Sequence, residues 1–398
     1  MRRPPTQFRP FSPFTLGALT ATAMGVATFG QSVFGVLASD LIDEFGIDRW
    51  QIGALVTASG LTGAAVSPFF GRVTDEVGGV RSVRGVLALG ALAMIVVAIS
   101  PTYAVLFIGA MLGGVPNGWT NPATNALIVD NVAVGSRGVI TSAKQSGVQM
   151  GAIFGGLLLP LLTSLTNWRI AFGMFLVFPV AGMLGMNRRP EMQRKKVKAS
   201  DRRGELSSVV RWLAIYGTLT GLGVSSVLTF LPLFAQETQG WTPAQAGLLV
   251  AGIGLVGIAA RIGWGSISER RLGHGRTLRR LSVLSAASAM LLALASAGIA
   301  SGWVLIPAAV LMGTGAVAWN AIGMLAVMDY STPALVGRGT GVIMLGFLTG
   351  IGLGPPLMGL SVDQLGTYTP GWLVLSVVFA ATTLVAAGVQ RTGTLATS

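Results

Sequence analysis

The sequence predicts an all-α membrane protein with twelve transmembrane helices in two halves of six. Of its 398 residues, 52% are hydrophobic and only 10% are charged, whereas a typical soluble protein has about 25% charged residues. The charges fall between long apolar runs. Each run offers the roughly 20 residues that a helix needs to cross the hydrocarbon of a bilayer.

In the first half, the uncharged gaps predict six crossings. Residues 84–130 hold two helices, which break at Ser100-Pro101. The gaps, in order, are 9–40, 49–72, 84–130, 144–169 and 169–188.

In the second half, the same count recurs after a basic stretch. Residues 280–329 hold a pair of helices, broken near Ser301-Gly302. The gaps are 211–237, 237–261, 280–329, 338–363 and 363–391. We therefore expect an N-terminal half (1–187), a basic cytoplasmic linker (188–208) and a C-terminal half (209–398).

The positions of the basic residues predict the topology. Lysine and arginine in short loops stay on the cytoplasmic side of a membrane. With both termini and the linker inside, only Arg49 and Arg169 fall outside. We expect a multi-pass protein of the plasma or inner membrane. The net charge of +13 then reflects topogenic loops beside the lipid bilayer, so no nucleic-acid partner is expected.

The two halves repeat glycine and tryptophan positions at constant spacing within each segment. Gly53 matches Gly247 and Gly71 matches Gly265 at a spacing of 194, and Gly113 matches Gly313 and Trp119 matches Trp319 at 200. Parallel repeats of this kind place a binding site near the membrane midplane, between the halves.

The loop after the second span carries Gly71, Asp75, Gly78 and Arg81. With the twelve spans and the basic central loop, this pattern resembles the major facilitator superfamily over the whole chain. One departure is Glu76, which stands where that family commonly has arginine. The resemblance implies a secondary transporter with alternating access, driven by gradients and without a cofactor.

By the same resemblance, this loop is a conformational latch that stabilises the outward-open state. We expect its glycines to allow close backbone approach, and Asp75 to lie at the positive end of a neighbouring helix. The alternative is a solvated set of topogenic charges. The latch residues are Gly71, Asp75, Gly78 and Arg81, with Gly265 and Glu269 as the second copy.

Lys144 lies about two turns into the fifth span, and ionisable groups inside a span are functional candidates because they are costly to bury. Gly147, Gly151 and Gly155 follow at three, seven and eleven residues, so they share its helical face. Faces of glycine pack on protein, which predicts an inward Lys144. The alternative is a lysine that extends to the cytoplasmic interface.

Arg261 lies one turn before Gly265 in the eighth span. It resembles the eighth-span arginine of monocarboxylate transporters and of the oxalate-formate antiporter, which binds substrate carboxylate. A guanidinium can bind a carboxylate through two parallel hydrogen bonds. Gly257, however, stands where the monocarboxylate carriers have a carboxylate. The alternative is an arginine that serves only the latch.

Other polar and aromatic side chains in the spans are candidates for substrate binding. Asparagines recur every four residues in the fourth span and share one face, although helix packing explains asparagines and tryptophans equally well. The candidates are Gln31, Asn117, Trp119, Asn121, Asn125, Gln145, Trp319 and Asn320.

Catalysis and metal binding have little support in the sequence. There is no cysteine, and the single histidine, His274, is expected in a solvated loop, so no metal site is predicted. No ATP-binding loop occurs. Carboxylates lie only near span ends, which leaves coupling to a rim carboxylate, to protons carried by the substrate or to a counter-transported solute.

We therefore expect a carrier for a small organic anion, with Arg261 and Lys144 holding negative charge, and we expect a monomer. An exporter of drugs or metabolites is the first alternative. A membrane receptor that keeps the carrier fold without transport is the second.

Overall fold

The computed structural model describes residues 11–132, 137–186, 206–330 and 336–397, and every regular element in these ranges is helical. Within the described residues, the first half contains eight helices. They are α1 (Pro13–Val33), α2 (Ala38–Phe45), α3 (Arg49–Val77), α4 (Gly79–Ala98), α5 (Tyr103–Asn131), α6 (Arg137–Leu165), α7 (Trp168–Met174) and α8 (Val177–Met186).

The second half begins with α9 at Ser208, and the boundaries of the linker remain a prediction because 187–205 lie outside the described residues. Its elements are α9 (Ser208–Gln239), α10 (Pro243–Ile267), the π-helix η3 (Ser268–Leu272), α11 (His274–Ser296), the 3₁₀ helix η4 (Gly302–Val304), α12 (Leu305–Thr314), α13 (Trp319–Tyr330), α14 (Val336–Leu365) and α15 (Thr369–Thr397).

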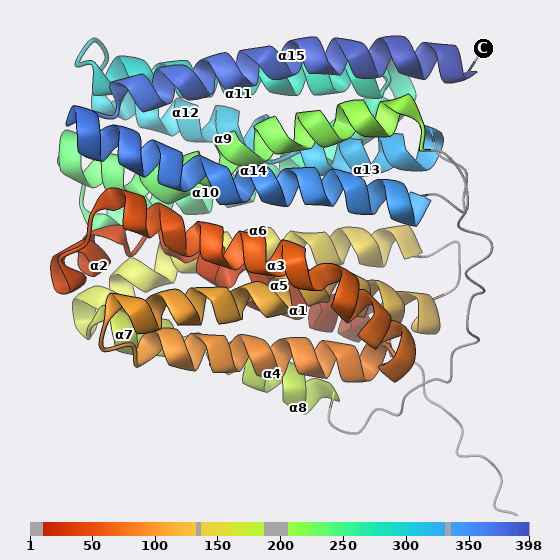
Figure 1. The fold of residues 1–398 in the computed structure, drawn as a ribbon, viewed down its shortest axis with the longest axis horizontal. Coiled ribbons are helices and arrows are strands. Elements are labelled where there is room, and N and C mark those ends of the chain that lie inside the picture. Colours follow the sequence, from red (N-terminus) through yellow and green to blue (C-terminus); the bar gives the residue numbers. More distant parts are fainter. Residues whose placement is uncertain (1–10, 133–136, 187–205, 331–335, 398) are drawn as a thin grey trace, which may run out of the picture.

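The helices run lengthwise through one bundle (Figure 1). Ten described helical spans are long and apolar enough to cross a membrane, or eleven if α1 and α2, bent by 58°, form one span. α5 has similar length but is not among them, because its asparagines and prolines lower its hydropathy. With α5 included, the arrangement is consistent with the twelve-helix prediction.

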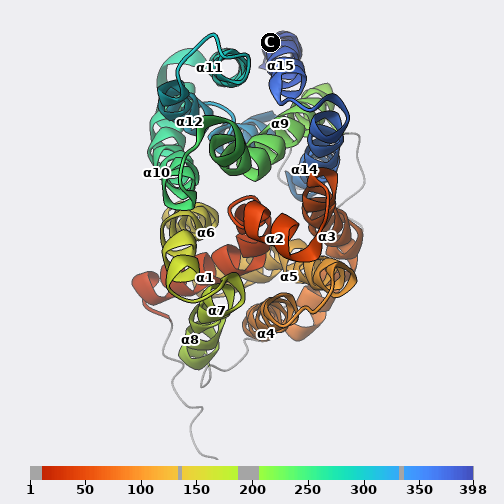
Figure 2. The same cartoon turned by 90° about the vertical axis from the view of Figure 1, so that its left-hand side faces the viewer.

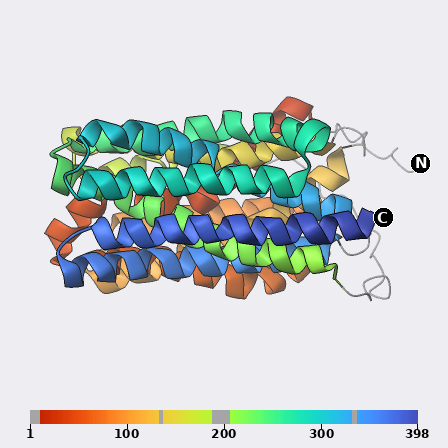
Figure 3. The same ribbon diagram turned by 90° about the horizontal axis from the view of Figure 1, so that it is seen from above.

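Both predicted breaks occur where expected. α4 ends at Ala98 and α5 begins at Tyr103, on either side of Ser100-Pro101, and α11 ends at Ser296 before η4 begins at Gly302. α1 begins and α15 ends at the same end of the bundle (Figure 3). We call this end the terminal end, and the opposite end the far end.

The two halves meet along α3 with α14 and along α6 with α10, as the end-on view shows (Figure 2). Glycines bring these helices together. A Cβ at Gly53 would lie 2.5 Å from the Pro355 carbonyl carbon, and one at Gly247 would lie 2.2 Å from the Gly156 carbonyl oxygen. These two glycines are the pair matched in the sequence repeat, and they hold equivalent positions in the two contacts between the halves, α3 with α14 and α10 with α6.

The turns that follow α3 and η3 share one backbone feature, a glycine with positive φ. Gly78 joins α3 to α4 with φ +86°, and Gly273 joins η3 to α11 with φ +74°. Positive φ favours glycine over residues with a Cβ. This requirement gives a local reason for Gly78 in the predicted latch, and Gly273 is its counterpart in the second half.

Candidate functional site

Lys144 on α6 points into the protein. Its side chain is 1% exposed, and its Nζ donates hydrogen bonds to Asn121 Oδ1 at 3.1 Å and to Asn125 Oδ1 at 2.7 Å on α5. Two of the three ammonium hydrogens are thereby used. The interfacial position considered as the alternative is wrong for this structure.

The glycine face predicted beside Lys144 packs on α1. A Cβ at Gly147 would lie 2.0 Å from Ala21 O, and one at Gly155 would lie 2.4 Å from Val33 Cγ1. Such close contact leaves no room for a side chain at Gly147 or Gly155. The α1–α6 seam therefore fixes the rotation of α6, and with it the direction of Lys144.

Arg261 on α10 reaches across to α6 of the other half. Its Nη1 donates to Gln149 Oε1 at 2.8 Å and to the Gln145 carbonyl at 3.4 Å. Its Nε donates to the Val317 carbonyl at 3.2 Å, in the break between α12 and α13. Irregular backbone inside a membrane must have its polar groups satisfied, so Arg261 also supports this break.

The remaining hydrogen-bonding capacity of the two cations consists of donors. Among the described residues, Arg261 Nη2 has no hydrogen-bond partner and neither cation pairs with a carboxylate. Lys144 on α6 thus directs its charge toward α5, and Arg261 on α10 directs its charge toward Gln145 and Gln149 of α6, with only neutral oxygens as partners.

Gln31 and Asn117 add two more donors. Gln31 Nε2 and Asn117 Nδ2 are buried atoms without a hydrogen-bond partner. Both side chains border one turn of α3: a Cβ at Gly60 would lie 3.6 Å from Gln31 Nε2, and one at Gly63 would lie 3.7 Å from Asn117 Cβ. Buried polar groups are ordinarily paired, so these orphan donors suit a bound group with acceptor oxygens.

A hollow of about 360 Å³ lies between α3 and α5 near the terminal end. Its lining includes Gly71 and Asp75 of the predicted latch, and also Asn125, which binds Lys144. The hollow therefore extends from the latch region to one of the two asparagines that bind Lys144.

Trp119 and Trp319 occupy equivalent packed positions, one in each half. Trp119 stacks on Phe70 with ring centroids 4.4 Å apart, and its Nε1 donates to Thr74 Oγ1 at 2.8 Å. Trp319 is 1% exposed and lies against Phe347. The structure thus shows both tryptophans in helix packing.

Asn320 is half-buried at the start of α13 and makes no hydrogen bond to a described residue. Gln145 contributes its backbone carbonyl to Arg261. The sequence-based list of polar candidates missed Gln149, whose side chain is 5% exposed and binds Arg261 directly. Its place one turn after Gln145, in the same polar stretch of α6, was the available signal.

The close backbone approach predicted at Gly71 and Gly265 for the latch is not present in this structure. A Cβ at either position would meet nothing within 4 Å, because the terminal ends of α3 and α10 stand clear of neighbours there. Glu269 is exposed on η3. The roles of Asp75, Arg81 and the other latch residues stay predictions.

The expected solvation of His274 is also wrong. His274 is 5% exposed, with Nδ1 2.8 Å from Ser268 Oγ and Nε2 2.6 Å from Asp329 Oδ2. It begins α11 and ties that helix to η3 and α13. Its charged neighbourhood in sequence suggested a loop, whereas the fold gives it a structural position.

Comparison with known proteins finds similarity to membrane transporters. The family model described as Major Facilitator Superfamily matches residues 20–355. An uncharacterised MFS-type transporter of Mycobacterium tuberculosis is 28% identical over 332 residues, covering 79% of this chain and 72% of that protein. A triacylglyceride transporter of Mycolicibacterium smegmatis is 26% identical over 245 residues, covering 61% of this chain and 42% of that protein.

Solved structures share the fold at low identity. A D-xylose-proton symporter superposes with a TM-score of 0.78 at 13% identity, covering 94% of this chain and 97% of that one. A bacterial homologue of the human lysosomal transporter Spinster, in an inward-facing and occupied conformation, gives 0.74 at 17% identity, with 96% of each chain covered.

Proposed function

Because the chain belongs to the Major Facilitator Superfamily, we propose that it is a secondary active transporter that moves a small organic anion, most favourably a carboxylate. Transport by alternating access requires a binding site near mid-membrane that both halves contribute to. Lys144 and its asparagines come from the first half, and Arg261 comes from the second.

The observation that carries this proposal is the excess of donors. Lys144 and Arg261 have only neutral partners among the described residues, and Gln31 and Asn117 present unpaired amide hydrogens. A carboxylate has two oxygens that accept several hydrogen bonds and neutralise charge. An anion is therefore the ligand class that satisfies these groups together.

The basic loops support an orientation with the terminal end in the cytoplasm of the inner or plasma membrane. The hollow that reaches Asn125 then lies on the cytoplasmic side. α6 carries both Lys144, which binds Asn121 and Asn125 of the first half, and Gln149, which binds Arg261 of the second half. A rocking movement of the halves would therefore pull Arg261 away from Gln149. An anion bound to both cations couples that movement to its own passage.

A thermal-shift screen of the purified protein tests the charge of the ligand. We expect carboxylates to raise the melting temperature, since a ligand that binds only the folded state stabilises it, by about 2.7 kcal/mol at 100 times Kd. Nitrate, sugars and cationic drugs complete the panel. Lys144→Gln should lose the shift, whereas Arg211→Gln, at the exposed start of α9, should keep it. Shifts with only neutral or cationic compounds would contradict the anion proposal.

An exporter of amphipathic or lipid-like solutes is the second candidate, and its support is the similarity to the triacylglyceride transporter. This candidate predicts ligands with long apolar chains in the same screen. It also predicts that Lys144→Gln keeps the shift, because an apolar ligand does not depend on the ammonium group.

For the latch, we expect Asp75→Asn to increase the population that is open at the terminal end, because the neutral side chain holds a helix terminus less strongly. Since the chain has no cysteine, a pair introduced at Thr141 on α6 and Ser266 on α10 reports the distance across that end. Cross-linking of this pair should fall in Asp75→Asn. An unchanged yield counts against the latch.

A further inference from the structure

A group of charged residues joins the two halves at the far end. Arg49 of α3 donates from Nη2 to Glu237 Oε1 at 2.9 Å and from Nε to Glu237 Oε2 at 3.1 Å, which is a two-pronged pair. Its Nη1 lies 3.4 Å from Asp363 Oδ1 of α14. One cation of the first half thus holds two carboxylates of the second. We call Arg49, Glu237, Asp363 and Tyr368 the far-end cluster.

Asp363 also caps a helix of the other half. Its Oδ1 accepts from the Arg49 backbone N–H at 3.3 Å, and its Oδ2 accepts from the Trp50 N–H at 2.9 Å. The first N–H groups of a helix have no partner within the helix, and they carry partial positive charge that favours a carboxylate. This cap exists only while α14 stays against the far end of α3.

Tyr368 completes the cluster. Its hydroxyl donates to Glu237 Oε2 at 2.6 Å, and the residue is 2% exposed. Burial, and then the neighbouring Glu237 carboxylate, raise the pKa of Tyr368. The hydroxyl therefore stays protonated and remains a donor, which leaves Glu237 held by two partners from different elements.

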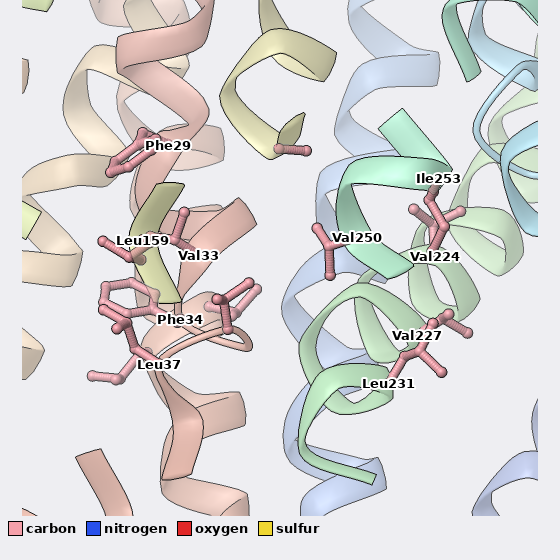
Figure 4. Close-up of a cluster of buried hydrophobic side chains, with 14 of the residues drawn as sticks. Phe29, Val33, Phe34, Leu37, Leu159, Val224, Val227, Leu231, Val250 and Ile253 are labelled. Atoms are coloured by element: carbon pink, nitrogen blue, oxygen red, sulfur yellow. The ribbon is translucent and has the colours of Figure 1, made fainter. Parts of the chain in front are cut away.

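Below the cluster, the halves are packed tightly. A Cβ at Gly359 would lie 2.6 Å from Trp50 N, and one at Gly35, where the chain turns from α1 to α2, would lie 2.4 Å from Thr229 O. Next to this contact, one buried apolar cluster includes Phe34 and Leu37 of the first half and Val227 and Leu231 of the second (Figure 4). The far end is thus closed by an ionic layer over an apolar one.

The terminal end differs at the corresponding helices. A Cβ at Gly71 of α3, or at Gly263 or Gly265 of α10, would meet nothing within 4 Å. Nearer the far end, a Cβ at Gly53 of α3 or at Gly247 of α10 would overlap backbone of the other half, whereas these three positions have open surroundings. This contrast is what a carrier closed on one side and open on the other requires.

We propose that the far-end cluster is the outer gate of the transporter: an ionic clamp that stabilises the state closed at the far end and must dissociate before the site opens there. This role as a gate rests on the proposed transport function. The equilibrium between the two conformations, which Arg49 biases toward the closed one, does not depend on which substrate is carried.

A cysteine at position 229 reports the opening of the gate. Thr229 is 1% exposed beneath the cluster, and its hydroxyl has no hydrogen-bond partner. The substitution Thr229→Cys therefore breaks no hydrogen bond of this side chain. In this cysteine-free chain, a water-soluble maleimide labels that thiol only when the halves part. In nanodiscs without substrate, Arg49→Gln should raise the labelling rate by on the order of 10-fold, because the rate follows the open population.

The matched control is Arg169→Gln. Arg169 pairs with Glu44 at the same end of the bundle, but both residues belong to the first half, so this variant should leave the labelling rate unchanged. Glu237→Gln removes the charge that the Arg49 guanidinium binds, so this variant should also raise the labelling rate. Unchanged labelling in Arg49→Gln, or an equal rise in Arg169→Gln, overturns the gate. Because no substrate is present, neither result depends on the anion site.

Discussion

Replacing Arg261 with glutamine is expected to reduce carboxylate uptake by on the order of 100-fold in kcat/KM. Truncating one partner of a buried, hydrogen-bonded charge pair costs about 2 to 5 kcal/mol, and each 1.4 kcal/mol is a factor of ten. Glutamine lacks both the charge and the free Nη2 donors that this structure leaves without partners. Uptake of radiolabelled carboxylate into proteoliposomes measures the effect.

Two further variants separate substrate binding from the structural contacts of Arg261. Arg261→Lys keeps the charge but cannot reach the Val317 carbonyl and Gln149 with a planar fork, so we expect partial activity. Arg211→Gln, on the exposed start of α9, should transport normally. If Arg261→Gln transports at the wild-type rate with an unchanged melting temperature, Arg261 does not hold the substrate.

Replacing Gly147 with valine is expected to cost about 3 kcal/mol or more in unfolding free energy, at or beyond the upper end of ordinary overpacking. The added Cβ would lie 2.0 Å from Ala21 O and 2.7 Å from Ala21 C. The obstacle is backbone, which cannot move aside as a side chain does. α1 and α6 must therefore separate, and Lys144 turns with α6. Thermal unfolding of the purified variant measures the loss.

The matched control for this substitution is Gly252→Val on α10. A Cβ at Gly252 would meet nothing within 4 Å, so only the small helix-propensity difference between glycine and valine remains. If both variants unfold at the wild-type temperature, the α1–α6 seam is looser than this structure has it. Loss of uptake in Gly147→Val alone is expected even at temperatures where the protein stays folded, because the seam positions Lys144.

Most of the helices follow directly from the sequence, because crossing a bilayer is a requirement on consecutive residues. The uncharged gaps located both breaks, at Ser100-Pro101 and near Ser301-Gly302. Helical spacing was also enough to turn Lys144 inward, since three glycines on one face predict packing on a neighbour. The uncharged gap at 84–130 also located α5, although asparagines and prolines lower the hydropathy of that span.

The partners of the site residues did not follow from the sequence. Gln149 lies 112 positions from Arg261, and Glu237 lies 188 positions from Arg49. No local pattern encodes such pairs, because they depend on which helix faces bring the two halves together. His274 shows the same limit: its sequence neighbours are polar, but Asp329 and Ser268 meet it only in the folded second half.

The sequence by itself determined the helical membrane architecture, the duplicated halves and the cations inside the spans. These are consequences of hydrophobicity and of helical periodicity, which act between neighbours along the chain. Only the tertiary structure decided that Lys144 binds asparagines of α5 and Arg261 binds α6, that their described partners are neutral, and that the far end is closed while Gly71 and Gly265 are unpacked. Those facts depend on contacts between helices distant in sequence, and rigid packing between the halves selects among arrangements that the same apolar pattern permits.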